Sequence, residues 1–408
     1  MTPFLQFLLT LMIILVAAKT AGYLSLLARQ PAVLGELLVG LLLGPSLLNL
    51  QHWPVFNAEG AQEALALFSE TGVLLLMFVA GLELHLSELL RSSKVSVLAG
   101  MFGVILPVGA GIGVGLGFGY ELKQAIFLGL TLGATSVSIS AQTLMELKTL
   151  RSRVGLGLLG AAVFDDILVI LILSIFLAFG GGNGGAWQVV WIFLRMIIFF
   201  SASAAFGVWV LPWLVRRIGR LPISQGTLTL GLVILFGYGL AAELVGSMAA
   251  ITGAFLAGLM FARSPEKERL ERGMSALAYG LFVPVFFVHI GLTVDVRMLD
   301  LQAIWLLVAI VTVAVFGKFI GAGGGARLAG FSWREATQLG AGMISRGEVG
   351  LILATVGISN GFMDAKLFSE IIGMVLVTTL ITPPLLRGLF GKQKAALEQT
   401  LRGNQEAG

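Results

Sequence analysis

The chain has 408 residues, of which 57% are hydrophobic and 12% are charged, and its formal net charge is +4. A soluble domain carries about 25% charged residues, so this composition excludes an ordinary soluble protein and indicates many membrane-spanning segments. The sequence contains no cysteine, which excludes disulfides and thiol chemistry, and its three histidines lie too far apart to suggest a metal-ligand cluster.

Apolar runs of about 20 residues, separated by polar breaks, predict an all-α membrane protein with about thirteen transmembrane helices. The expected helices span residues 4–24, 31–48, 62–84, 95–118, 123–146, 154–179, 187–214, 224–243, 247–262, 274–292, 302–325, 334–358 and 366–390. Because their number is odd, the two termini are expected on opposite sides of the bilayer.

The basic residues of the loops indicate the orientation. Nineteen of the 26 lysines and arginines fall in loops on one side, while Lys123, Arg297 and Lys366 fall on the other. Short loops rich in lysine and arginine stay in the cytoplasm. We therefore expect a multi-pass protein of the cell (inner) membrane, with its N-terminus outside and its C-terminus inside. The basic residues are spread over seven loops, so no nucleic-acid surface is expected.

An odd helix count also suggests two six-helix repeats, inverted in the membrane, around a linker helix. The spacing Gly35-x4-Gly40 resembles Gly253-x4-Gly258, which supports this weakly. Inverted repeats are typical of transporters, because exchanging the conformations of the halves produces inward-open and outward-open states. The expected organisation is one membrane transport unit at 1–402, with a first repeat at about 4–179, a linker helix at about 187–214, a second repeat at about 224–390, and a short cytoplasmic tail at 391–408.

Two of the expected helices carry small polar residues at matching positions. The helix at 123–146 contains Thr135 and Ser136, and the helix at 334–358 contains Arg346 and Glu348. Such residues weaken a membrane helix and favour an unwound stretch, whose backbone carbonyls and half-helix ends can face a small ion. Arg346 and Glu348 either hold the break together or line the ion path, and the sequence leaves both alternatives open.

Asp165 and Asp166 lie next to each other inside an apolar run long enough to cross the bilayer. A charged side chain at membrane depth costs about 2.5–3.5 kcal/mol, so such a pair indicates an ion or proton site. Lys318 lies deep in another expected helix and needs a countercharge, which either aspartate can provide. Neighbours on a helix point about 100° apart, so one acid can face Lys318 while the other faces a cavity.

This arrangement predicts competition between a cation and a proton. Two close carboxylates resist joint ionisation, so one of them is expected to hold a proton near neutrality. A hard cation prefers carboxylate and carbonyl oxygens and displaces that proton. With alternating access to both sides, competition produces exchange. The sequence contains no nucleotide-binding loop, so an ion gradient is expected to drive transport without a cofactor.

These residues belong to a set of motifs spread over nearly the whole chain. They are Gly35–Glu36–Leu37–Leu38–Val39–Gly40, Gly44–Pro45, Gly81–Leu82–Glu83, Ala134–Thr135–Ser136, Phe164–Asp165–Asp166, Gly317–Lys318 and Arg346–Gly347–Glu348–Val349–Gly350–Leu351. Together they resemble the monovalent cation/proton antiporter-2 family, the bacterial sodium/proton and potassium/proton exchangers.

The resemblance implies a dimerisation domain and a core domain, with two crossed broken helices, an elevator movement of the core and a homodimer in the lipid bilayer. It implies that Asp166 is the principal ion- and proton-binding carboxylate and that Asp165 pairs with Lys318 until a cation binds. Thr135 and Ser136 are expected to line the same site. The two adjacent acids favour electrogenic sodium/proton exchange over potassium/proton exchange.

Three alternatives remain at this point. A potassium/proton exchanger would use the same site with another cation. A cation channel would show flux that is not coupled to protons. An intramembrane aspartyl protease needs carboxylates from two helices around one water molecule, which adjacent residues on one helix cannot provide. A transporter is therefore expected, and an enzyme is not.

Overall fold

The computed structural model describes residues 2–50, 53, 56, 59–84, 92–180, 186–218, 221–222, 224–293, 297, 304–347, 349–350, 353–354, 357 and 362–406. Every regular element in these ranges is a helix, which confirms the all-α prediction. Ten helical segments of this described part are long and apolar enough to cross a membrane. They run through α1 (Pro3–Leu27), α3 (Glu59–Leu82), α5 (Ser93–Gly117), α6 (Leu122–Gly133) with α7 (Val137–Glu146), α8 (Arg153–Gly180), α9 (Ala186–Ala205) with η2 (Phe206–Val210) and α10 (Leu211–Ile218), α11 (Gly226–Leu244), α13 (Lys267–Leu277) with η3 (Ala278–Phe282) and α14 (Val283–Leu292), α15 (Ile304–Leu328) and α18 (Ala365–Glu406).

Three shorter helices account for the rest of the expected pattern. α2 (Ala32–Leu43) and α12 (Ala250–Phe261) are apolar but have only 12 residues each. α16 (Trp333–Gly342) begins the helix expected at 334–358, and the chain beyond it is described only in part.

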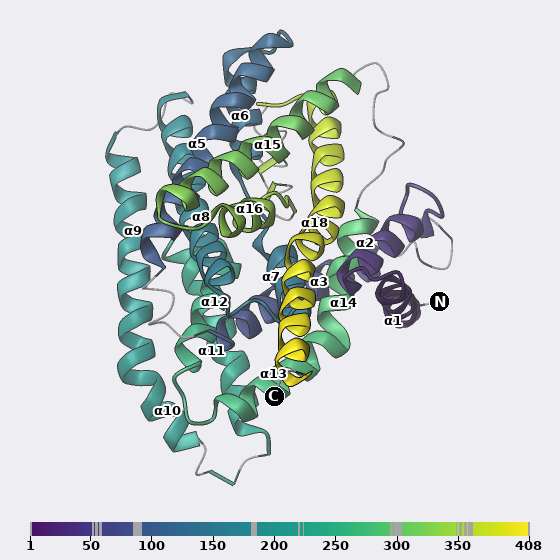
Figure 1. Cartoon of the computed structure of the whole chain (residues 1–408), viewed down its shortest axis with the longest axis vertical. Helices are drawn as coiled ribbons and strands as arrows, with labels where there is room; N and C mark the ends of the chain where they lie inside the picture. The colour runs from purple at the N-terminus through teal and green to yellow at the C-terminus, as the bar shows by residue number, and fades with distance from the viewer. Residues whose placement is uncertain are drawn as a thin grey trace.

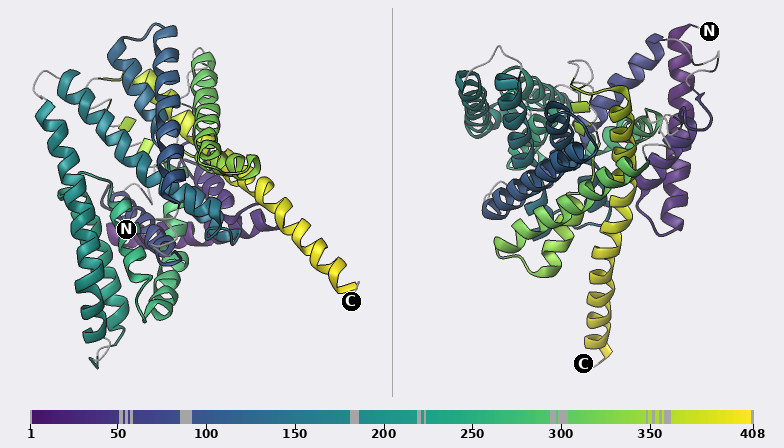
Figure 2. Two further views of the ribbon diagram at one scale, coloured as in Figure 1. Left: turned by 60° about the vertical axis from the view of Figure 1, so that its left-hand side comes forward. Right: turned by 90° about the horizontal axis from the view of Figure 1, so that it is seen from above.

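Two helices are longer than the apolar runs predicted. The segment expected to start at 274 is helical from Lys267, because Leu270 and Met274 are buried while the polar residues between them face outward. α18 continues to Glu406 through the expected tail, whose alanine, leucine, glutamate, glutamine and lysine residues favour a helix. Figure 2 shows this last part of α18 projecting away from the other helices.

The helices pack as two bundles (Figure 1). α1, α2, α3, α11, α12 and α14 form one, which we call the scaffold bundle. α5, α6, α7, α8, α15, α16 and α18 form the other, which we call the core bundle. α7 packs against α2 and α3, α18 packs against α2, and α9 contacts α8 as well as α11 and α12. These helices therefore mark the boundary between the bundles.

Glycines bring the scaffold helices into backbone contact. A Cβ on Gly35 would lie 2.2 Å from a carbonyl oxygen of α1, and a Cβ on Gly253 would lie 2.2 Å from one of α11. A Cβ on Gly40 would lie 2.1 Å from a carbonyl oxygen of α14, and a Cβ on Gly258 would lie 2.0 Å from one of α3. Only glycine permits this approach. In each half of the chain, a pair of glycines therefore lets one short helix contact the backbones of two neighbouring helices. The inverted repeat itself stays a prediction.

Candidate functional site

The two predicted helix breaks meet in the core bundle. α6 ends at Gly133 and α7 begins at Val137, while α16 ends at Gly342 and is followed by non-helical backbone. The Ser136 N–H donates to the Ser345 carbonyl oxygen at 3.0 Å, and the Ser345 hydroxyl donates to the Ser136 carbonyl oxygen at 2.6 Å. Unwinding leaves these backbone groups without partners in their own helices. The hydrogen bonds between the two breaks satisfy some of them.

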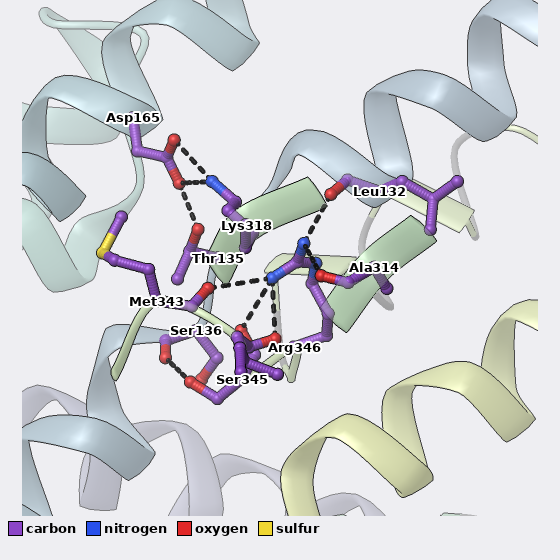
Figure 3. Close-up of polar contacts among 10 residues, drawn as sticks. Leu132, Thr135, Ser136, Asp165, Ala314, Lys318, Met343, Ser345 and Arg346 are labelled. Atoms are coloured by element: carbon purple, nitrogen blue, oxygen red, sulfur yellow. Dashed lines mark hydrogen bonds and ion pairs between the residues drawn. The ribbon is translucent and has the colours of Figure 1, made fainter. Parts of the chain in front are cut away.

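Arg346 is fully buried and binds the backbone around both breaks (Figure 3). Its guanidinium donates hydrogen bonds to the carbonyl oxygens of Leu132 (2.6 Å), Ala314 (3.3 Å), Met343 (3.1 Å), Ile344 (2.8 Å) and Ser345 (3.3 Å). The carboxyl ends of helices carry unpaired carbonyls and partial negative charge, which a guanidinium neutralises. These contacts favour the alternative in which Arg346 holds the breaks together. Glu348 lies outside the described residues.

Asp165 is completely buried and faces the core bundle. Both of its carboxylate oxygens accept hydrogen bonds from Lys318 Nζ at 2.7 Å, and the Thr135 hydroxyl donates to Oδ2 (Figure 3). The side chains of Lys318 and Asp165 are 0% and 1% exposed. Three elements of one bundle, α8, α15 and the break after α6, therefore hold this carboxylate.

Asp166 has different surroundings. It lines a narrow cavity with α3, α7 and α12, and the Thr252 hydroxyl of α12 donates to its Oδ2 at 3.1 Å. The space open to water there is about 10 Å³, close to that of one water molecule. Asp165 thus contacts its own bundle, whereas Asp166 faces the boundary with the scaffold bundle. The residues alone left open which acid meets Lys318, whereas the family resemblance implied Asp165, and the structure pairs Lys318 with Asp165.

The structure brings together Asp165, Lys318 and Thr135, and places Asp166 beside them on α8. Ser136 lies in the break, where its hydroxyl is 3.0 Å from the Ser138 hydroxyl. Its position in the break agrees with the prediction, but the described contacts tie its side chain to another serine.

Two buried polar residues were not predicted, Thr252 at this site and Glu370 elsewhere in the core bundle. Thr252 gives no signal in the sequence, because a threonine in an apolar helix is common and it lies 86 residues from Asp166. Glu370 of α18 is 0% exposed. Asp165 and Asp166 were predicted because carboxylates inside an apolar run are costly. The same rule, applied to the apolar run at 366–390, would have found Glu370.

The sequence of the chain is similar to those of known transporters. Residues 9–390 match the family model described as sodium/hydrogen exchanger, transmembrane. The chain is 40% identical to the Na(+)/H(+)-K(+) antiporter GerN of Bacillus cereus, over 96% of this chain and 98% of that protein. It is 36% identical to a Na(+)/H(+) antiporter of Enterococcus hirae, over 94% of this chain and 98% of that protein.

More distant matches extend the range of cations and support the fold. The K(+)/H(+) antiporter 1 of Saccharomyces cerevisiae is 27% identical over 95% of this chain and 47% of its own length. The solved sodium proton antiporter MjNhaP1 of Methanocaldococcus jannaschii superposes with a TM-score of 0.66 at 17% identity, covering 96% of this chain and 99% of that one. The chain therefore belongs to the sodium/hydrogen exchanger family, a family of monovalent cation/proton antiporters, which confirms the resemblance seen in the sequence.

Proposed function

We propose that this antiporter exchanges sodium for protons electrogenically, and that Asp166 and Asp165 bind the cation with help from Thr135 and Ser136. The observation that carries the proposal is the separation of the two acids. Asp165 is neutralised by Lys318 inside the core bundle, whereas Asp166 lines a cavity at the bundle boundary. Asp166 is thus the acid that faces the cavity, and Asp165 is the acid that is paired with a positive charge.

The net charge of the site differs by one between the two states of the proposed cycle, from zero without a cation to −1 with a cation bound. Without a cation, Asp166 holds a proton and the ionised Asp165 accepts hydrogen bonds from the Lys318 ammonium, so the site is neutral. When a cation binds, Asp166 loses its proton and Asp165 turns from Lys318 to the cation. Lys318, deprived of its partner in a dry environment, then loses a proton as well. Two protons leave for one cation, and each exchange moves one net positive charge.

Access to the two sides follows from the two bundles. We propose that the core bundle moves against the scaffold bundle as an elevator, carrying Asp165 and Asp166 across the membrane barrier. The Thr252–Asp166 hydrogen bond joins α12 to α8 across the boundary, so it must form and break in each cycle. The broken helices travel with the acids, because Arg346 ties them to α15.

The remaining features of the proposal come from the sequence. The loop charges favour an external N-terminus and a cytoplasmic C-terminus in the inner membrane. Residues 1–402 are proposed to act as one transport unit with inverted repeats, and two chains to form a homodimer. Potassium is the second candidate cation, since potassium appears in the names of relatives such as the Bacillus cereus and Saccharomyces cerevisiae antiporters.

A flux assay tests the proposal. Liposomes containing the protein are given an imposed proton gradient, and its collapse is followed after addition of lithium, sodium or potassium chloride. We expect sodium to dissipate the gradient, Asp166→Asn to abolish the response, and a matched change of an exposed acid, Glu121→Gln, to leave it intact. A response to potassium alone would support the second candidate. Full activity of Asp166→Asn would overturn the assignment of the site.

A further inference from the structure

A second polar cavity, of about 290 Å³, lies between the bundles away from the Asp166 cavity. Its walls come from α1, α2, α7, η3 and the start of α14, and we call it the boundary crevice. Its polar side chains are Lys19, Glu36, Gln142, Glu146 and Tyr279. The described residues of the crevice contribute two carboxylates, an amide, a phenol and one ammonium. None of these groups takes part in the exchange proposed above.

The hydrogen bonds of the crevice satisfy Glu146. Its Oε2 accepts from the Ala32 N–H at 2.7 Å, and its Oε1 accepts from the Val33 N–H at 3.3 Å and from Gln142 Nε2 at 2.9 Å. Ala32 and Val33 are the first residues of α2, so this carboxylate binds the positive end of a helix across the bundle boundary. The charge of Glu146 is therefore compensated by the protein.

Glu36 has no hydrogen bonds of this kind, and the Lys19 ammonium in the same crevice attracts it only through space. The Glu36 side chain lines the crevice and is only 7% exposed, yet in the part of the chain that the structure describes no hydrogen bond or ion pair reaches its carboxylate. The nearby ammonium of Lys19 donates instead to the Tyr279 carbonyl oxygen at 2.8 Å. Gln142 Oε1 is also buried without a donor. With two carboxylates and one ammonium, the crevice carries one net negative charge. A positively charged ligand would compensate this charge and could also contact the unpaired Gln142 oxygen.

We propose that the boundary crevice binds a monovalent cation, with the Glu36 carboxylate as its anionic ligand and Gln142 Oε1 as a neutral ligand. Carboxylate and amide oxygens are the ligands that hard cations prefer. The one net negative charge of the crevice suits a cation with a single positive charge. A divalent ion would require more acids, and the described residues contain no group of three histidine, cysteine or acidic side chains suited to a metal.

The position of the crevice gives this site a role. α7 lines both cavities, with Val137 in the wall of the Asp166 cavity and Gln142 and Glu146 in the wall of the crevice. At 1.5 Å per helical residue, these points lie roughly 8–14 Å apart along α7. The loop charges place the Glu146 end of α7 on the cytoplasmic side. The crevice thus holds a cation between the cytoplasm and Asp166.

Cation binding to the purified protein tests the site apart from transport. Sodium, lithium and potassium chloride are titrated calorimetrically at alkaline pH into Asp166→Asn protein, in which the proposed central site is disabled, with choline chloride as the blank. We expect saturable binding that Asp166→Asn/Glu36→Gln weakens by about tenfold or more. The exposed acid Glu243 provides the matched control, since Asp166→Asn/Glu243→Gln should bind as Asp166→Asn does. Absent binding in Asp166→Asn, or unchanged binding after Glu36→Gln, would overturn the proposal.

Two further measurements keep the test decisive. If Glu36→Gln does not yield folded protein, Gln142→Leu in the Asp166→Asn background replaces it, and unchanged affinity there contradicts the site. In flux assays with otherwise wild-type protein, Glu36→Gln should raise the apparent KM for cytoplasmic sodium by about 3- to 10-fold and leave the maximal rate within about twofold. This proposal rests on the exchange proposed above, but different results refute the two. Transport by Asp166→Asn would refute the central site, whereas absent or unchanged binding in the titration would refute the crevice.

Discussion

The Lys318–Asp165 ion pair provides a quantitative test of the site. Each oxygen of Asp165 lies 2.7 Å from Lys318 Nζ, and both side chains are at most 1% exposed. At an effective dielectric constant near 20, the attraction at this distance is about 6 kcal/mol, and the loss of hydration offsets much of it. Removing one partner strands the other charge, which typically costs about 3–5 kcal/mol.

We therefore expect Lys318→Met and Asp165→Asn each to lower the free energy of unfolding by about 3–5 kcal/mol, and the double variant to recover most of the loss. Unfolding in mixed detergent micelles, followed by circular dichroism, measures all corners of the cycle. Lys123→Met removes an exposed lysine at the start of α6 and serves as the control. Additive losses in the double variant, or single variants as stable as the control, would refute the account of a buried, mutually dependent pair.

Three other substitutions have defined outcomes. In Arg346→Lys, a single ammonium cannot bind several carbonyls in different directions at once. This variant should lower the free energy of unfolding by about 3 kcal/mol or more, measured in the same micelles, and added cation should not restore the stability. Thr252→Val removes the hydrogen bond to Asp166 and should change the apparent KM for the cation in flux assays by about tenfold, whereas Thr252→Ser should behave as wild type; equal effects of both would contradict a role for the hydroxyl. Gly258→Ala places a Cβ 2.0 Å from a carbonyl oxygen of α3 and should lower the melting temperature, while Gly237→Ala, with no atom within 4 Å, should not.

The sequence alone predicted the parts of the site that depend on the cost of charge in a membrane. Asp165, Asp166 and Lys318 were found because each is expensive in an apolar run. The breaks were found because small polar residues weaken a helix at matching places. The pairing of Lys318 with Asp165 was not predictable from the residues, since it depends on how α8 is rotated in the bundle, and packing sets that rotation.

The contacts that complete the site depend on tertiary structure. Thr252 belongs to a helix of ordinary apolar composition, and only the packing of α12 beside α8 brings its hydroxyl to Asp166. The carbonyls that bind Arg346 come from α6, α15 and the break after α16, so no local pattern distinguishes holding a break from lining an ion path. The helical continuation of α18 was missed because a search for apolar spans stops where polar residues begin.

The central claim, that a cation and protons compete for Asp166, is tested most directly by measuring proton release when sodium is added to purified protein in weakly buffered detergent solution. Since metal binding to a protonated site liberates its protons, we predict that Glu36→Gln protein, in which only the central site is intact, releases about two protons per bound sodium ion, and that Asp166→Asn/Glu36→Gln protein does not. Saturable sodium binding to Glu36→Gln protein without proton release would contradict the claim, as would unchanged release from Asp166→Asn/Glu36→Gln.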